Sequence, residues 1–284
     1  MADAVGQADL RAENVSRIVT GFALQEFKLL QICSIEASNS WTEKYQQETS
    51  ADLTGGLGSN VRGVPRLAAF PYGEVTWTEQ TDRLEKYGMD GIISWEDGMT
   101  NEIDVIARTL LRVARAVAKA VDDRIYAVIT ANTANDNASL AAWNATVIAD
   151  RNPIQDILDS KTLIAEDEYD PDRNGFLLLN PKDYGNLLGN ANIRNAGQFY
   201  TDEVTRNGNV GKLLGLKVIR STSITADEAC VIIGKEAITW KQAHPLTVHT
   251  IEDPGVKWTI RAWTVGVAQL KNPNAKSVIT NTAL

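Results

Sequence analysis

The sequence predicts an α+β protein, and three observations indicate this class. Apolar residues recur at three- and four-residue steps over residues 100–128, which is the pattern of one long amphipathic helix. Segments rich in β-branched and aromatic residues lie on both sides of that helix, as expected of strands. The helical and strand patterns follow no internal repeat, and a length of 284 residues suits about two domains.

The composition excludes several classes of protein. There are 28 Lys and Arg residues against 36 Asp and Glu, and the formal net charge of -8 argues against a surface that binds nucleic acid or anionic lipid all over. The net charge does not argue against a local basic patch. Two Cys and two His leave no disulfide framework and no Cys/His zinc cluster. The chain has no apolar run of membrane-spanning length and no signal peptide at its start. We therefore expect no enzyme, no cofactor and no membrane partner.

Residues 1–38 are expected to form an N-terminal arm with a helical middle. The apolar residues of this segment are only loosely spaced at helical intervals, and they close no globular core. Terminal segments of this kind are usually ordered only where they dock onto something. These apolar residues are Val15, Ile18, Val19, Phe22, Phe27 and Leu30.

Residues 39–88 are expected to form an extended loop. Strand-like segments at 41–48 and 74–87 flank about 25 mostly polar residues that include a glycine-rich tract. Two strands joined in this way have almost no core of their own, so the segment either packs on a partner or is disordered. Aromatic residues that favour order indicate the partner interpretation. They are Trp41, Tyr45, Trp77 and Tyr87.

The helix expected at 100–128 carries a basic stripe. At about 100° per residue, four cations fall within roughly 60° of one another and almost opposite the apolar face. Acidic residues lie only near the helix ends. Two interpretations stay open with equal weight: a solvated face, which normally mixes signs, or a surface that meets a polyanion without sequence selectivity. The four cations are Arg108, Arg112, Arg115 and Lys119.

The second half of the chain alternates short helices and strands. Pro153 and Pro181 each stand at the first turn of a predicted helix, and a short buried strand is expected between these helices at 176–179. A turn is expected at Asp253-Pro254-Gly255. The other expected strands are 217–220, 229–234, 237–240, 246–252 and 256–269, with a last apolar step at 278–280.

Candidate sites for chemistry give only weak signals. Asp170, Asp172 and Asn174 match the first half of a calcium-binding loop, but the bidentate Glu of such a loop is missing, so a solvated turn is favoured. His244 and His249 have no third ligand type near them and are expected at the surface or in packing.

Six stretches stand in a distinctive order along the chain: EVTWTEQTDRLEKYGMDGIISWEDG (74–98), residues 101–129, NPIQDILDSKTLI (152–164), GFLLLNPKDYGNLL (175–188), GKLLGLKVIRSTSI (211–224) and WTIRAWTVGVAQLKNPNAKSVIT (258–280). In this order and spacing, the chain resembles the major capsid proteins of tailed bacteriophages with the Hong Kong 97-type fold, which encapsulin shells share. Residues 101–129 are similar to the long spine helix of that fold.

The resemblance implies a division of the chain into parts. They are an N-terminal arm (1–38), an extended β-hairpin loop that lies over a neighbouring subunit (39–88), a peripheral domain (89–150 and 246–284) with its spine helix at about 100–128, and an axial domain at hexamer and pentamer centres (151–245). The loop residues expected at the contact between subunits are Trp41, Tyr45, Trp77, Arg83, Lys86 and Tyr87. In this family the spine helix lies along the inner side of the shell, which favours a DNA-facing role for Arg108, Arg112, Arg115 and Lys119.

The resemblance also implies a function. It is that of a major capsid protein, which self-assembles into hexamers and pentamers of an icosahedral phage head around double-stranded DNA. The head would assemble in the cytoplasm of the bacterial host. An encapsulin-like compartment that packages a cargo enzyme is the alternative. Because the arm before the extended loop is short, a separate scaffolding protein is expected, along with a portal and a decoration protein. No motif assigns the Lys–Asn crosslink that some members form.

Overall fold

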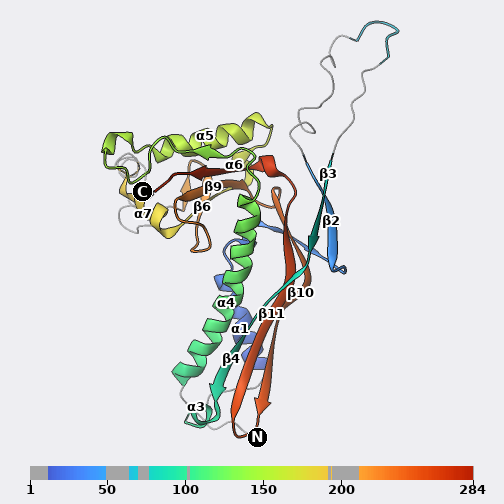
Figure 1. Ribbon diagram of the computed structural model, residues 1–284, viewed down its shortest axis with the longest axis vertical. Coiled ribbons are helices and arrows are strands. Elements are labelled where there is room, and N and C mark those ends of the chain that lie inside the picture. Colours follow the sequence, from blue (N-terminus) through green and yellow to red (C-terminus); the bar gives the residue numbers. More distant parts are fainter. Residues whose placement is uncertain are drawn as a thin grey trace.

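The computed structural model describes residues 12–48, 64–69, 77–100, 103–190, 193 and 211–283. Helix α4 (Ile103–Thr130) sets the long axis and runs beside a four-stranded sheet (Figure 1). A six-stranded sheet lies at the C-terminal end of α4, and a two-stranded hairpin stands to the side. This mixture of helices packed on separate, largely antiparallel sheets confirms the predicted α+β class.

The apolar face of α4 packs against the four-stranded sheet. Leu110, Val113 and Val117 of the helix are buried together with Ile260 and Ala262 of the sheet. The three- and four-residue steps place the apolar side chains on one side of the helix, so the cations project from the other side. In order across the sheet, the strands are β1 (Ser34–Ala37), β10 (Ile238–Asp253), β11 (Lys257–Leu270) and β4 (Glu85–Ser94). The short helix α3 (Trp95–Met99) connects β4 toward α4.

The N-terminal segment docks onto its own subunit. Helix α1 (Ala12–Glu26) packs on α4 and β10, and Val15, Val19 and Ala23 are buried in the core that they share. The four-residue steps between these three side chains place them on one face of the helix. A single turn of 3-10 helix, η1 (Leu30–Ile32), follows.

Strand β10 is longer than the sequence predicts. Two separate strands were expected at 237–240 and 246–252, but one strand runs from Ile238 to Asp253 and pairs with β11 along its length. The pairing register shifts between Gln242 and His244 and again between His244 and Thr247. Pro245 lies in the second shift, and because proline has no N–H for the ladder, a bulge carries the strand past it.

The six-stranded sheet forms the second packed part of the subunit, at the C-terminal end of α4. Its strands, in order, are β5 (Asn137–Ala138), β12 (Lys276–Thr280), β9 (Glu228–Ile233), β6 (Gly175–Leu179), β8 (Leu216–Arg220) and β7 (Lys212–Leu213). All of β6 is buried, which agrees with the apolar run expected at 176–179. Helix α5 (Pro153–Glu166) packs on β12, β5 and β9, and α7 (Pro181–Gly189) follows β6. Pro153 and Pro181 stand in the first turns of these helices, as predicted.

The last strand differs from the expected division of the chain. Residues 246–284 were grouped with the long helix, but β12 lies in the six-stranded sheet, between β5 and β9. Its residues from Lys276 to Ile279 are all buried. A strand buried on both faces needs a place inside a sheet that is covered on both sides, and the six-stranded sheet provides that place.

The remaining strands form the hairpin. Strands β2 (Thr42–Gln47) and β3 (Thr78–Arg83) pair antiparallel, with Thr42 opposite Arg83 and Gln47 opposite Thr78. One continuous strand was expected at 74–87, but buried Leu84 separates β3 from β4, and residues 74–76 lie outside the described ranges. Leu84 packs with Val265 and Val267 of β11, which turns the chain from the hairpin into the four-stranded sheet.

Candidate assembly and polyanion-contact surfaces

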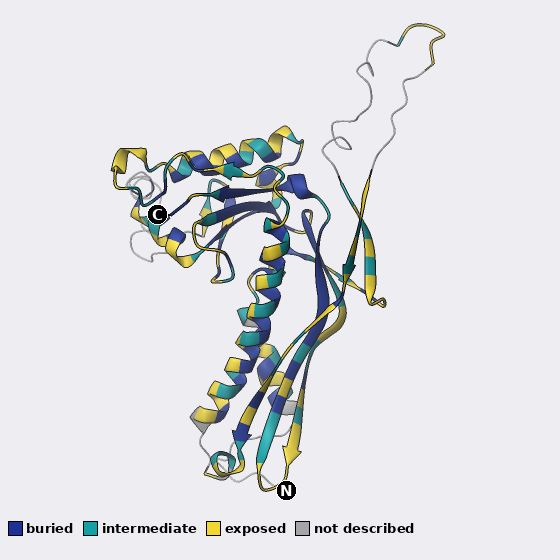
Figure 2. Ribbon diagram, viewed as in Figure 1, coloured by how far each residue is buried: buried dark blue, intermediate teal, exposed yellow. Residues whose placement is uncertain are grey.

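The hairpin is attached to the subunit at its root and by a few side contacts. The backbone N–H of Leu84 donates to the carbonyl of Trp41 at 3.0 Å, which extends the pairing of the two hairpin strands to the root, where Leu84 packs on Val265 and Val267. At the other end of β2, the Glu48 N–H donates to the carbonyl of Lys271 at 3.0 Å, and the Tyr169 hydroxyl donates to the Glu48 carboxylate at 2.9 Å. Figure 2 shows the hairpin mostly in the exposed and intermediate colours, in contrast to the six-stranded sheet.

The six predicted loop residues divide into two groups. Trp41 and Trp77 are 67% and 51% exposed, and Arg83 is also exposed. Tyr45 is half-buried, and its burial and the nearby Asp82 carboxylate raise the pKa of its hydroxyl to about 12.

The other two residues lie on β4. The Tyr87 ring packs 6.0 Å from that of Trp240, and its hydroxyl donates to Glu85 at 2.6 Å. The Lys86 ammonium lies 5.7 Å from the centre of the Trp263 ring. The exposed pair of tryptophans is thus available to another molecule, whereas Tyr87 serves packing within the subunit.

The basic stripe of α4 is exposed, as its position opposite the apolar face requires. Arg108, Arg112 and Lys119 are exposed and form no ion pair with a carboxylate of the described ranges. Arg115 differs, because its Nε lies 2.8 Å from the Glu26 carboxylate of α1. Within the described ranges, three of the four cations therefore have no carboxylate partner, and the fourth helps to hold α1 on α4.

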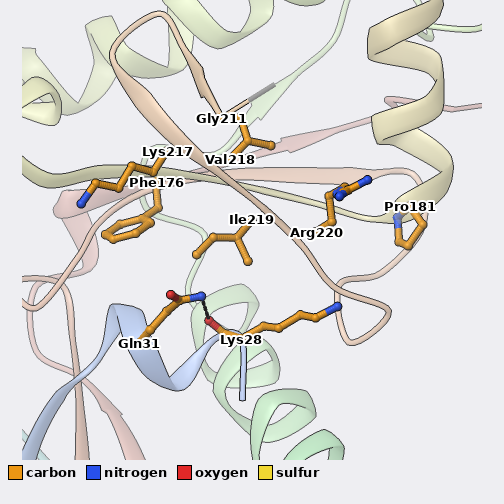
Figure 3. Close-up of a pocket in the computed structure, with 9 residues that line it drawn as sticks. All are labelled: Lys28, Gln31, Phe176, Pro181, Gly211, Lys217, Val218, Ile219 and Arg220. Atoms are coloured by element: carbon orange, nitrogen blue, oxygen red, sulfur yellow. Dashed lines mark hydrogen bonds between the residues drawn. The ribbon is translucent and has the colours of Figure 1, made fainter. Parts of the chain in front are cut away.

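Three further cations, which the sequence analysis did not identify, line a cavity near this stripe. Lys28, Lys217 and Arg220 line a cavity of about 660 Å³ at the junction of the N-terminal segment and the six-stranded sheet (Figure 3). Lys28 is about 190 positions away from Lys217 and Arg220 in the sequence, so no local pattern brings it to them. The one available signal was the density of cations in Lys212, Lys217 and Arg220, around a strand whose face could not be assigned.

The acidic stretch uses its side chains in structural bonds. Asp170 caps the short helix α6 (Pro171–Asn174) by accepting the Asp172 N–H at 3.0 Å. Asp172 pairs with the Lys161 ammonium at 2.5 Å, and Asn174 donates to the Gly234 carbonyl at 2.9 Å. These side chains point to different partners. Within the described part of the chain, no three His, Cys, Asp or Glu side chains gather in a way that could hold a metal ion.

Both histidines pack on one aromatic ring. His249 stacks on Trp263 with ring centres 5.2 Å apart, and His244 lies 5.9 Å from the same ring. Cys33 and Cys230 are buried free thiols, and burial raises the pKa of Cys230 to about 12. A thiol that stays protonated is a poor nucleophile. None of the helices in the described ranges has the length and apolar character needed to cross a bilayer.

Known structures share this architecture. A phage-related protein from Bordetella bronchiseptica aligns over 98% of this chain and 99% of its own, with a TM-score of 0.68 and 14% identity. The capsid of the cyanophage P-SCSP1u aligns over 99% and 92%, with a TM-score of 0.66 and 13% identity. A virus-like particle from Pyrococcus furiosus aligns over 95% and 100%, with a TM-score of 0.64 and 10% identity. These likenesses confirm the Hong Kong 97-type fold that the sequence resemblance implied.

A match to a family sequence model identifies the family of the chain. No curated protein sequence matches the chain. The sequence model that describes phage capsid proteins matches residues 78–281, which extend from β3 through β12 and include the spine helix α4. Because that match covers well over half of the chain, and the fold agrees with it, the chain belongs to the phage capsid protein family.

Proposed function

We propose that this capsid protein associates with copies of itself as hexamers and pentamers, which close an icosahedral phage head around double-stranded DNA. The observation that carries the proposal is the pair of exposed tryptophans on a projecting hairpin. Trp41 and Trp77 expose 67% and 51% of their surface. Large aromatic side chains gain more than most from burial at a protein contact, at roughly 25 cal/mol per Å² of apolar area.

The hairpin has the structure expected of a segment that packs on a neighbouring subunit. A two-stranded ribbon is marginally stable by itself. Here the packing of Leu84 and the hydrogen bond of Glu48 already attach it to the subunit, so burial against a neighbour would add to an existing attachment. In this proposal the parts of the chain keep the division expected from the sequence: arm (1–38), extended loop (39–88), peripheral domain (89–150 and 246–284) and axial domain (151–245). Strand β12 is the exception to this division, because it lies in the six-stranded sheet to which residues 151–245 contribute four strands.

The basic stripe is proposed to face the packaged DNA. Arg108, Arg112 and Lys119 lie on the exposed side of α4 and have no partner carboxylate in the described ranges. Unpaired cations on one face attract phosphates without reading sequence. The net charge of -8 keeps the rest of the surface from binding DNA, so contact with the genome stays weak enough for packaging.

The remaining partners follow from the same proposal. A separate scaffolding protein guides the curvature, a portal admits the DNA and a decoration protein binds outside. The protein acts as a structural unit without catalysis, and it resides in the virion after assembly in the host cytoplasm.

Electron microscopy of the purified full-length chain, expressed alone and with scaffolding protein, tests the proposal. We expect closed, uniform particles. A matched variant that lacks residues 50–70 should give a folded subunit and no closed particles. Normal particles from that deletion would contradict the role of the loop, and a compact monomer from the full chain under both conditions would contradict the shell function.

A compartment that packages a cargo enzyme is the second candidate, because the fold is also that of a virus-like particle from Pyrococcus furiosus. The contents of particles purified from the native host separate the two. Nuclease-resistant DNA of genome length supports the phage head. A co-purifying enzyme in place of DNA supports the compartment.

A further inference from the structure

The cavity that contains Lys28, Lys217 and Arg220 has the chemistry of an anion site. Its volume is about 660 Å³, and none of the lining residues that belong to the described ranges is acidic. None of the three cations forms an ion pair with a carboxylate in the described ranges. Figure 3 shows side chains from two parts of the chain around one space: Lys28 from the segment after α1, and the other two from β8.

Aromatic rings hold two of the cations in place without neutralising them. The Lys217 ammonium lies 5.2 Å from the centre of the Phe176 ring, and the Arg220 guanidinium lies 4.5 Å from that of Tyr184. A cation over an aromatic face keeps its full charge while its side chain loses freedom. Binding an anion therefore requires less ordering of these side chains than of free surface cations.

The fold explains why both faces of β8 contribute. Strand β7 pairs only with Leu216 and Lys217, so residues 218–220 lie past its end. Successive side chains of a strand point to opposite faces, and at such an edge both can line one cavity. On the other side, the Asp122 carboxylate of α4 accepts the N–H groups of Lys28 at 3.0 Å and Leu29 at 3.1 Å, which fixes the backbone of Lys28 beside α4.

The cavity is continuous with the basic stripe. A smaller cavity of about 170 Å³ shares Lys28 with the first one and is also lined by Arg115 and Lys119 of α4. Ser221, which directly follows Arg220, lines it as well. Its two carboxylates are engaged: Glu26 pairs with Arg115, and Asp122 accepts the two backbone N–H groups.

We propose that this cavity binds phosphate groups of double-stranded DNA and extends the α4 stripe into one basic track, from Arg108 to Lys217. The inference rests on the proposed DNA-facing role of α4 and adds Lys28, Lys217 and Arg220 to it. A guanidinium and two ammonium groups are the usual phosphate ligands of proteins. A polyanion is favoured over an acidic peptide because the stripe alone covers about 16 Å of helix, at 1.5 Å per residue, before the cavity begins.

The salt dependence of DNA binding tests the proposal. Binding of a fluorescent 30-base-pair duplex to the unassembled full-length chain is measured by anisotropy between about 50 and 200 mM KCl, the range over which phosphate contacts change affinity most visibly. Each phosphate contact contributes about 0.9 to the slope of log K against log salt. The double variant Lys217→Gln/Arg220→Gln is expected to reduce that slope by up to about 1.8.

Two controls make the result specific. Arg173→Gln/Lys257→Gln removes the same charges from residues that line neither cavity, and it should change the slope by less than half as much. The exchange Lys217→Arg/Arg220→Lys keeps the charges and should restore the slope. If the first double variant does not fold, Lys28→Gln, a change at an exposed residue, replaces it with an expected loss of about 0.9.

The outcomes separate this inference from the shell function. Equal slopes for the cavity and control variants would overturn the DNA site, while wild-type particles in the micrographs would leave the capsid assignment standing. Loss of assembly with an unchanged slope would show that the cavity binds protein, and it would overturn the proposal as well. Failure of the wild-type chain to form particles would count against the shell function alone.

Discussion

Lys276 of β12 and Asp136, in the loop after α4, form an ion pair of 2.7 Å in which the lysine side chain is fully buried. The same ammonium donates to the carbonyl of Asn132. The pair therefore fastens the last strand of the chain to the end of the spine helix. A buried charge that loses its partner costs more than the pair contributes, because it stays desolvated.

Asp136→Asn is accordingly expected to lower the free energy of unfolding by about 3 kcal/mol, measured by urea denaturation of the unassembled chain. Lys276→Met leaves only Asp136, which solvent reaches in part, and should cost less. Adding Lys276→Met to Asp136→Asn should recover some of the loss. If Asp136→Asn has no measurable effect, the buried ammonium has another charge partner.

Asp122 predicts a pH dependence of stability. Burial raises the pKa of its carboxyl to about 6, against an ordinary value of 3.8, even though the backbone N–H groups of Lys28, Leu29 and Leu30 favour the charged form. Between pH 3.8 and 6 the folded chain therefore binds this proton more readily than the unfolded chain, so the group adds stability as the pH falls through 6.

The comparison of wild type with Asp122→Asn isolates this effect, because the amide oxygen can still accept the hydrogen bonds. From pH 7 to pH 5, the free energy of unfolding of the wild type should rise by about 1 kcal/mol relative to the variant. Denaturant titrations at the two pH values measure it. A constant difference between the two proteins would show that Asp122 is ionised throughout.

The two exposed tryptophans predict a separation of folding from assembly. The double variant Trp41→Ser/Trp77→Ser should keep the thermal midpoint of the unassembled subunit within about 2 °C, because exposed positions contribute little to stability. It should form few or no particles by light scattering and electron microscopy. Trp95→Ser, at a residue that is 39% exposed on α3, is the matched control and should still assemble. Normal assembly of the double variant would remove the hairpin tryptophans from the subunit contact.

The stripe on α4 predicts an effect on DNA content alone. Arg108→Glu/Arg112→Glu should leave particle assembly intact and reduce the amount of packaged DNA, because both side chains are exposed on the face away from the core. Arg115 is left unchanged, since its pair with Glu26 holds α1. Quantitative measurement of DNA per particle gives the answer. Full heads from this variant would show that the stripe does not face the genome.

The sequence predicted those elements whose signals are local. The periodicity around Leu110 and Val117 specified α4 and its exposed stripe, and Pro153 and Pro181 marked two helix starts. The whole length of β10 was not predictable in this way, because Pro245 reads as a break and only pairing with β11 shows the bulge. The position of β12 in its sheet, and the position of Lys28 and Arg220 at one cavity, depend on contacts between segments that are distant in the sequence. No local sequence pattern predicts such contacts.

The position of β12 has a consequence for the order of events during synthesis. This strand follows the other strands of the described ranges in the sequence, yet it lies between β5 and β9, and without it β9 would expose an unpaired edge. The six-stranded sheet can therefore close only after β12 has left the ribosome. Until then a nascent chain carries an open strand edge that a second chain could pair with, so the time between the synthesis of β9 and that of β12 is the interval in which mispairing can occur.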